Sequence, residues 1–303
     1  MAIINRAALN ARFTEYKKEF NTSYGELSKK STDWKTVSSH VKSGTDINDY
    51  AALLDNPAVT QWIGPRTVSN LTARTYQLQN QDWQATVQIN RNDIRDNKDG
   101  MIMDRIRDLP SQWGKKVRFD IFDAYRTGSA AASLCWDGRP FFDNLHPVAG
   151  GVVSNENTGG AHAHPWILLD SKIAMGGVLF QEREKPYPTT LGEGSEWAYH
   201  NNTYLFSVTG RYTVGYGHWQ AAYQSNQAFT EANFWLAYQA MLQFTDENGY
   251  EMDIDPDTLI YFPTDTAVVR RVLKKTGLYW DGTGAVDSAA RGMIKNLVPC
   301  AYI

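Results

Sequence analysis

One apolar stripe between residues 102 and 125 constrains the fold of this chain more than any other feature of its sequence. Seven large side chains recur there at intervals of three or four residues, namely Ile102, Ile106, Leu109, Trp113, Val117, Ile121 and Tyr125. This spacing follows the pitch of an α-helix for about seven turns. It predicts a helix over residues 101–126 with one face on a core. Pro110 should kink that helix or split it in two.

Two stretches before the stripe contain too few apolar side chains for cores of their own. Residues 6–20 place Leu9, Phe13, Tyr16 and Phe20 at helical spacing, and the polar stretch 21–35 follows. Residues 64–95 have the pattern of a long β-hairpin, with arms at 76–79 and 86–89 and a turn at 80–82. A lone hairpin is only marginally stable in water. We therefore expect both stretches to be ordered by contacts with neighbouring copies of the chain.

The remainder of the sequence alternates strand and helix patterns. Strands are predicted at 166–169, 177–181, 204–208, 212–214, 259–262 and 297–303. Thr230 should cap one helix, and Thr264 should begin another that ends at Gly277. Residues 129–165 are rich in glycine, alanine, asparagine and histidine and are expected to form mostly loop. These elements predict an α+β fold.

Charge and hydropathy exclude several classes of protein. The formal net charge of −3 argues against a dedicated nucleic-acid binder, although residues 1–43 carry eight bases against four acids. Residues 246–257 hold six acids and no base. Each of these segments is explained either by a solvated face or by contacts between copies of the chain. No apolar run approaches the length of a membrane span, and the first residues do not resemble a secretory signal. We expect a cytosolic product.

No combination of residues predicts catalysis, a metal or a cofactor. Cys135 and Cys300 are too few for a disulfide framework, and with six scattered histidines they lack zinc-ligand spacing. His162 and His164 are better explained as polar loop residues than as ligands. Asp143 and His146 could form an acid–histidine pair, but no nucleophile is near them in sequence. The glycine clusters lack the phosphate-loop pattern, and the acidic run lacks EF-hand spacing.

Ten tryptophans leave a binding function open. Aromatic side chains can form stacking platforms for sugars or bases, which keeps a β-rich carbohydrate-binding or hydrolytic protein as an alternative. The tryptophans are spread over the whole chain, however, so packing in cores or interfaces explains them better.

A series of short motifs, in order along nearly the whole chain, resembles the major head protein of Mu-like tailed phages. The motifs include WIGPR at 62–66, YQLQN at 76–80 and TVQINRND at 86–93. Later ones are DGRPFFD at 137–143 with His146, WILLD at 166–170, FQEREKP at 180–186, GYGHWQ at 215–220, and the segments 210–211, 234–242 and 259–263. The residues that we single out from them are Phe141, Phe142, Asp143, His146, Gly215, Gly217 and Trp219.

The resemblance implies the Hong Kong 97-type capsid fold. It divides the chain into an N-terminal arm with an entry helix (1–60), an extended E-loop (61–98), a peripheral domain (99–222) and an axial domain (223–303). The helix at 101–126 would be the spine of the peripheral domain, and 129–165 has no clear place. Some relatives crosslink an E-loop lysine to a neighbour's asparagine. Residues 64–95 contain no lysine, and the nearest is Lys98, so we expect shells without such crosslinks.

The resemblance also implies a structural function in the virion, with no catalytic residues and no cofactor. The chain would assemble in the host cytoplasm into hexamers and pentamers of an icosahedral shell. Its expected partners are a scaffolding protein, a portal, a decoration or minor capsid protein and non-specifically held double-stranded DNA, with no membrane. The expected interface residues are Phe13, Phe20, Arg66, Tyr76, Trp83, Val87 and Ile89. An encapsulin-like shell around cargo protein would use the same fold and remains an alternative.

Overall fold

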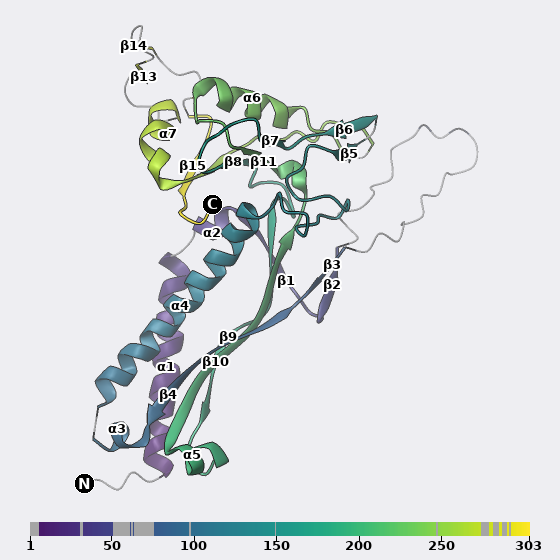
Figure 1. Ribbon diagram of the computed structural model, residues 1–303. Helices are drawn as coiled ribbons and strands as arrows, with labels where there is room; N and C mark the ends of the chain where they lie inside the picture. Colours follow the sequence, from purple (N-terminus) through teal and green to yellow (C-terminus); the bar gives the residue numbers. More distant parts are fainter. Residues whose placement is uncertain are drawn as a thin grey trace.

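A computed structural model describes residues 6–30, 33–50, 61, 63, 76–96, 98–148, 150–246, 248–273, 279–280, 285–286, 290 and 292–303. These residues form a long shaft that carries a head at one end (Figure 1). The shaft consists of two long helices and the four-stranded sheet β1-β9-β10-β4, and the head contains the five-stranded sheet β15-β12-β8-β11-β7. The expected α+β class is therefore present.

The shaft sheet is built on one long hairpin. Strands β9 (Val178–Leu191) and β10 (Thr203–Tyr216) pair antiparallel along its length. Strand β4 (Gln81–Asn90) pairs antiparallel with β10, and the short β1 (Ser38–Lys42) lies parallel to β9. The two predicted strands at 204–208 and 212–214 are thus one continuous strand, whose pairing with β9 is irregular around residues 209–212.

The predicted hairpin between 76–79 and 86–89 is wrong. Strand β3 (Gln77–Gln79) pairs with β2 (Ile47–Asp49), while β4 pairs with β10. The buried Asn80 between β3 and β4 gives a physical reason. Its side-chain amide donates to the carbonyls of Thr45 and Asp46 at 2.9 and 3.0 Å, which binds the end of β3 to the turn before β2.

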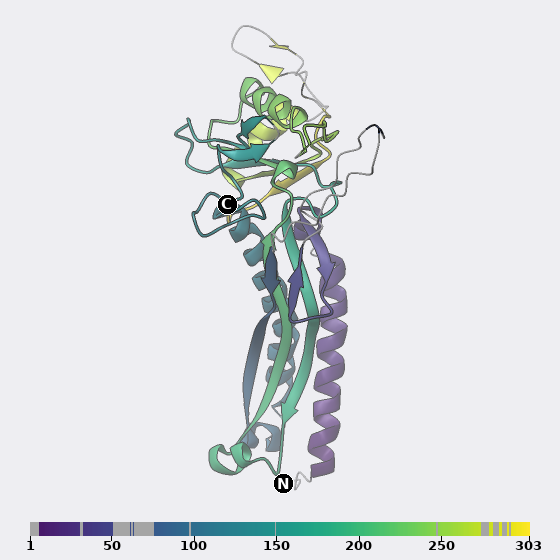
Figure 2. The same cartoon turned by 90° about the vertical axis from the view of Figure 1, so that its right-hand side faces the viewer.

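Helices α1 (Arg6–Lys30) and α4 (Asp99–Arg126) run side by side along one face of this sheet (Figures 1 and 2). Of the two effects expected of Pro110, a kink or a split, the split is wrong, because α4 continues through this buried proline. Proline removes one backbone hydrogen bond from the helix. Ile106, before the proline, and Val117, after it, are both buried. Packing of this apolar stripe on the sheet therefore stabilises the helix on both sides of the lost hydrogen bond.

The expectation that the N-terminal stretch lacks a core of its own is also wrong. Leu9, Phe13, Tyr16 and Phe20 are between 0 and 4% exposed and belong to one buried cluster with residues of α4 and β10. The polar residues after position 20 continue the same helix. Charged side chains cross to α4, where Arg12 pairs with Asp99, and Glu19 with Arg107 at 2.5 Å. Two charged residues of α1 are thus paired within the same subunit.

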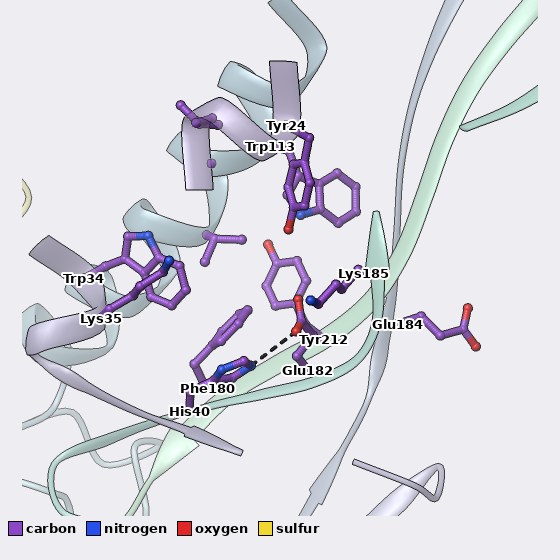
Figure 3. A pocket seen from close by; sticks show the side chains of 13 residues that line it. Tyr24, Trp34, Lys35, His40, Trp113, Phe180, Glu182, Glu184, Lys185 and Tyr212 are labelled. Atoms are coloured by element: carbon purple, nitrogen blue, oxygen red, sulfur yellow. Dashed lines mark ion pairs between the residues drawn. The ribbon is translucent and has the colours of Figure 1, made fainter. Parts of the chain in front are cut away.

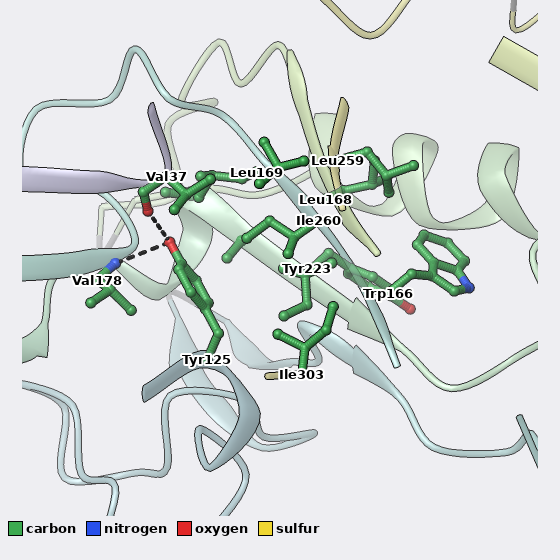
Figure 4. Close-up of a cluster of buried hydrophobic side chains, with 14 of the residues drawn as sticks. Val37, Tyr125, Trp166, Leu168, Leu169, Val178, Tyr223, Leu259, Ile260 and Ile303 are labelled. Carbon is green, nitrogen blue, oxygen red and sulfur yellow. Dashed lines mark hydrogen bonds between the residues drawn. The ribbon is translucent and has the colours of Figure 1, made fainter. Parts of the chain in front are cut away.

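A second, larger core fills the head and extends into the adjoining end of the shaft (Figure 4). Every position of β8 (Trp166–Leu169), β11 (Ala222–Ser225) and β12 (Thr258–Tyr261) is buried. The edge strands are β15 (Asn296–Pro299) and β7 (Glu156–Asn157). Because β8, β11 and β12 belong to one sheet, strands from both sides of the expected division at 222/223 pair with one another.

Two helices accompany the head sheet. Helix α6 (Glu231–Leu242) begins where expected, with the Thr230 hydroxyl accepting a hydrogen bond from the Asn233 amide at 3.2 Å. Helix α7 (Thr266–Leu273) follows the 3-10 turn η3 (Pro263–Asp265), so Thr264 lies within the turn that precedes it. The expected helix end at Gly277 lies outside the described residues.

Shaft and head meet at the end of α4. The Tyr125 hydroxyl donates to the Val37 carbonyl at 2.6 Å and accepts from the Val178 amide at 3.2 Å (Figure 4). One buried side chain thus joins the helix to the start of β9 and to the residue before β1. The remaining described elements are short. The helical ones are α2 (Asp33–Thr36), α3 (Arg91–Arg95), α5 (Glu196–Asn201) and η2 (Trp219–Ala221). The strands form two antiparallel pairs, β5 (His146–Val148) with β6 (Gly151–Val153) and β13 (Tyr279–Trp280) with β14 (Ala285–Val286).

Candidate functional site

The motif residues of the sequence gather in a buried joint between shaft and head, which we call the joint. The His146 Nδ1 lies 2.6 Å from a carboxylate oxygen of Asp137, and neither side chain is exposed. The His146 ring stacks on Trp219, with 4.1 Å between the ring centroids. Phe141 stacks in turn on Tyr216, the last residue of β10. Segments far apart in the sequence are therefore fixed to each other where the two sheets connect.

Asn155 connects the loop region to this joint. Its side-chain amide donates to the Phe141 carbonyl at 2.8 Å, and its side-chain oxygen accepts from the Asp143 amide at 3.0 Å. The sequence did not single out this residue. An asparagine whose donors and acceptor are all used within the core fixes backbone geometry, because leaving such a buried group unpaired is costly.

The two motif glycines allow close approach of segments at the joint. A Cβ atom on Gly217 would lie 1.8 Å from the Met175 carbonyl oxygen, and one on Gly215 would lie 2.5 Å from the Leu78 side chain. The first clash is with backbone, which cannot rotate aside. Gly217 is thus required for the approach of the β10–β11 connection to the turn before β9.

The expected acid–histidine pair has a different acid. His146 pairs with Asp137, whereas the Asp143 carboxylate lies 3.9 Å from Arg139. The thiol of Cys135 is also in the joint, donating to the Gly217 carbonyl at 3.1 Å, and burial raises its pKa well above the usual value. A buried protonated thiol is a poor nucleophile. These contacts hold the joint together and do not form a nucleophile–base pair.

The remaining candidate ligands do not converge. His164 stacks on Phe262 with ring centroids 3.6 Å apart. The Nε2 atom of His162 instead lies 3.5 Å from a carboxylate oxygen of Asp265. Within the described residues, no three histidine, cysteine or acidic side chains are grouped so as to hold a metal ion. No described helix has both the length and the apolar character needed to cross a bilayer.

The residues expected at subunit interfaces lie in three kinds of place. Phe13, Phe20 and Ile89 are buried in the shaft core of their own subunit, so these side chains are not available to a neighbour in this conformation. Tyr76, Trp83 and Val87 are half-buried against the same subunit, and Arg66 lies outside the described residues. In the expected spine stripe, Ile102, Ile106, Val117 and Ile121 are buried, while Leu109 and Trp113 are half-buried.

An aromatic cavity of about 340 Å³ opens between the helices and the shaft sheet (Figure 3). Trp34, Trp113, Phe180 and Tyr212 line it together with charged side chains, among which His40 and Glu182 lie 3.3 Å apart. Tyr24 also faces this space. Burial, with a smaller contribution from the nearby Glu182 carboxylate, raises the pKa of Tyr24 to about 12.

Exposed apolar side chains were missed by the sequence reasoning. Those at the end of the shaft that lies away from the head are Leu191, Trp197 and Tyr199. Among the tryptophans whose side-chain exposure the structure describes, only Trp197 is exposed, and the others are buried or half-buried. The tryptophans therefore do not form a surface platform in the described part of the chain, and that removes the observation behind a sugar-binding function.

Comparison with known proteins gives one consistent result. Residues 9–298 match the family described as Mu-like prophage major head subunit gpT. The chain is 29% identical to the Mu-like prophage FluMu major head subunit of Haemophilus influenzae, covering 100% of both sequences. It is 27% identical to the major capsid protein of Escherichia phage Mu, covering 98% of both.

Solved structures have the same fold. A chain from the procapsid of bacteriophage JBD30 superimposes with a TM-score of 0.78 at 27% identity, over 99% of this chain and 100% of that one. A chain from the bacteriophage JBD30 capsid gives a TM-score of 0.72 at 19% identity, over 89% of this chain and 90% of that one. The second likeness concerns the fold alone.

Proposed function

The chain belongs to the family of Mu-like prophage major head subunits, and from this premise we propose how its parts build an icosahedral head around the phage genome. It is a major capsid protein, a structural component of the virion rather than an enzyme. The observation that carries the proposal is the family match over residues 9–298, with a fold that superimposes along 99% of the chain on a procapsid subunit.

We assign the subdomains of a Hong Kong 97-type subunit from the observed strand pairing. The shaft would be the peripheral domain, with α4 as its spine, and the head would be the axial domain. The axial domain would then include β8 and β11 as well as the chain after residue 223, since these strands share a sheet with β12. The joint would hold the two domains at a fixed angle.

We further propose that the E-loop starts and ends at the β2–β3 pair, rather than spanning 61–98. Ile47 pairs with Gln79 and Asp49 with Gln77 in antiparallel register, so the connection between β2 and β3 begins and ends at neighbouring positions. Residues 51–60, 62 and 64–75 of this connection lie outside the described residues. The E-loop would then have both of its ends held on its own subunit by the β2–β3 pair.

Assembly would rest on many modest contacts between identical copies. Closed symmetry repeats each contact in hexamers and pentamers, and a contact too weak to hold two subunits becomes effective when several act together. Further partners would be a scaffolding protein, a portal and non-specifically held double-stranded DNA. A solved relative, the bacteriophage JBD30 capsid, is decorated with minor capsid protein trimers, which supports a similar partner here.

Particle analysis tests this function. The chain is expressed with the other head proteins of its phage, and the particles are purified by sedimentation and treated with nuclease. We expect fast-sedimenting shells, dominated by this 34.2 kDa chain, that protect double-stranded DNA. Shells that enclose a cargo protein and no DNA would instead support the encapsulin-like alternative. A chain that stays monomeric under these conditions would contradict the proposal.

A further inference from the structure

The β2–β3 pair is too short to keep its own place on the subunit. Each strand has three residues, and the pair is separate from the four-stranded sheet of the shaft. It lies on the side of that sheet away from α1 and α4 (Figures 1 and 2). A lone two-stranded ribbon is only marginally stable in water. Side chains of the shaft must therefore hold it in position.

Gln181, on β9, contacts the chain on both sides of the connection between β2 and β3. It is fully buried. Its side-chain oxygen accepts a hydrogen bond from the hydroxyl of Tyr50, the residue directly after β2, at 2.6 Å. Its side-chain amide donates to the Leu78 carbonyl in β3 at 3.2 Å and to the Asn80 side-chain oxygen at 2.9 Å. One side chain of the shaft sheet thus binds both strands of the pair.

Further contacts fix the same pair. The Asn80 side-chain amide donates to the Ser43 hydroxyl at 2.9 Å, and the Ser43 backbone amide donates to the Glu182 carbonyl on β9 at 3.0 Å. The Leu78 side chain fills the space beside Gly215 on β10, where a Cβ atom would lie 2.5 Å from it. Hydrogen bonds to β9 and close packing on β10 therefore act on the pair together.

A buried polar network of this kind selects one geometry. The side chains of Tyr50, Asn80 and Gln181 are between 0 and 5% exposed. Apolar surfaces can slide past each other at little cost, whereas a buried donor or acceptor that loses its partner is strongly penalised. A shift of the pair along the sheet would break several of these hydrogen bonds at once. The network therefore determines position as well as adding stability.

We propose that Gln181 is a positioning residue for assembly, which holds the β2–β3 pair, and with it both ends of the E-loop, at one place on the shaft. The motifs at 76–80, 180–186 and 215–220 all contribute to this place. A loop with fixed ends loses less conformational entropy on binding than a loop whose ends can move. This inference rests on the proposed function, since the E-loop acts in an assembling subunit.

Hydrogen exchange in the unassembled subunit tests whether the network holds the pair. Tyr50→Phe removes a buried hydroxyl that donates at 2.6 Å, and the matched control Tyr125→Phe removes another that donates at the same distance in the joint region. Relative to the amides of residues 204–208, we expect those of 47–50 and 77–80 to exchange about tenfold faster in Tyr50→Phe and in Gln181→Met. In Tyr125→Phe this ratio should equal that of the wild type. Wild-type ratios in both network variants would overturn the proposal.

The yield of closed shells tests whether this position matters for assembly. Gln181→Met is compared with Thr213→Val, because Thr213 lies opposite Gln181 on β10 and is also buried, but no hydrogen bond joins it to the described residues of the pair. We expect Gln181→Met to lower the yield about tenfold and Thr213→Val to leave it unchanged.

The other outcomes separate this inference from the proposed function. Wild-type yield from Gln181→Met despite faster exchange, or an equal loss in both variants, would overturn the positioning role while leaving the proposed function intact. If wild-type subunits form no shells at all, it is the proposed function that fails, whatever the exchange rates show.

Discussion

Replacing Phe13 by alanine separates a core role for α1 from an interface role. The Phe13 side chain is 4% exposed, and its ring meets Tyr204 edge to face with centroids 6.1 Å apart. Removal of a buried phenylalanine ring costs about 3–5 kcal/mol of folding free energy, since it leaves a cavity as well as losing apolar contact. If the helix were ordered only by neighbouring subunits, the same change would leave the free energy of unfolding of the lone subunit unaltered.

The assay is denaturant unfolding of the purified, unassembled subunit, followed by circular dichroism. Phe119→Ala is the matched control, because this ring is 40% exposed on α4 and packs edge to face on Tyr302. We expect a loss of about 3–5 kcal/mol for Phe13→Ala, and of about 1 kcal/mol for the control. A loss below about 1 kcal/mol for Phe13→Ala, with normal helix content, would refute the packing of α1 on its own subunit.

Three further predictions concern the joint, the aromatic cavity and the assembled shell. Gly217→Ala should destabilise the subunit by at least about 1–3 kcal/mol, because its Cβ would meet the Met175 carbonyl oxygen at 1.8 Å. Gly25→Ala, in α1 with open space around it, should instead stabilise by about 0.5–1 kcal/mol, and equal thermal shifts in both variants would contradict the close approach. Because the pKa of Tyr24 is raised from 10.0 to about 12, its contribution to stability is complete below pH 10 and is lost as the pH rises towards 12. The free energy of unfolding of Tyr24→Phe, measured at alkaline pH, should therefore fall less steeply with pH than that of the wild type. Identical pH profiles for the two proteins would contradict the raised pKa of Tyr24. Denaturing gels of intact shells should show this chain at 34.2 kDa without a covalent ladder, because neither residues 50–76 nor residues 64–95 contain a lysine, and a ladder would disprove this.

The sequence predicted elements whose signal is local. The stripe from Ile102 to Tyr125 is a periodic pattern and corresponds to α4. It could be predicted because the spacing of apolar residues along a helix is the same whichever element the helix packs against. The Thr230 cap is equally local, since the hydroxyl and the amide that it accepts from are three residues apart.

The sequence did not identify partners that are distant along the chain. The alternation of Val87 and Ile89 indicates a strand, but nothing in it distinguishes β3 from β10 as the neighbour, and loop length favoured the wrong choice. Likewise, the apolar face with Phe13 and Phe20 shows that this helix is covered. It does not show whether the cover comes from the same subunit or from another.

The joint illustrates the same limit. Asp137 and His146 are nine residues apart, and Trp219 is far along the chain from both. The acid nearest to the histidine, Asp143, was the natural expectation. An unpaired charge in a folded core is costly, so a buried acid must lie beside a partner. Which residues are neighbours depends on the fold and not on their separation in the sequence.

Electron cryomicroscopy of the purified particles tests the central claim most directly. We predict closed icosahedral shells whose repeating unit fits this subunit, with α1 packed on α4 of the same chain and the head and shaft joined at Trp219. Particles without a closed lattice of this chain, or a lattice in which α1 packs only on a neighbouring subunit, would contradict it.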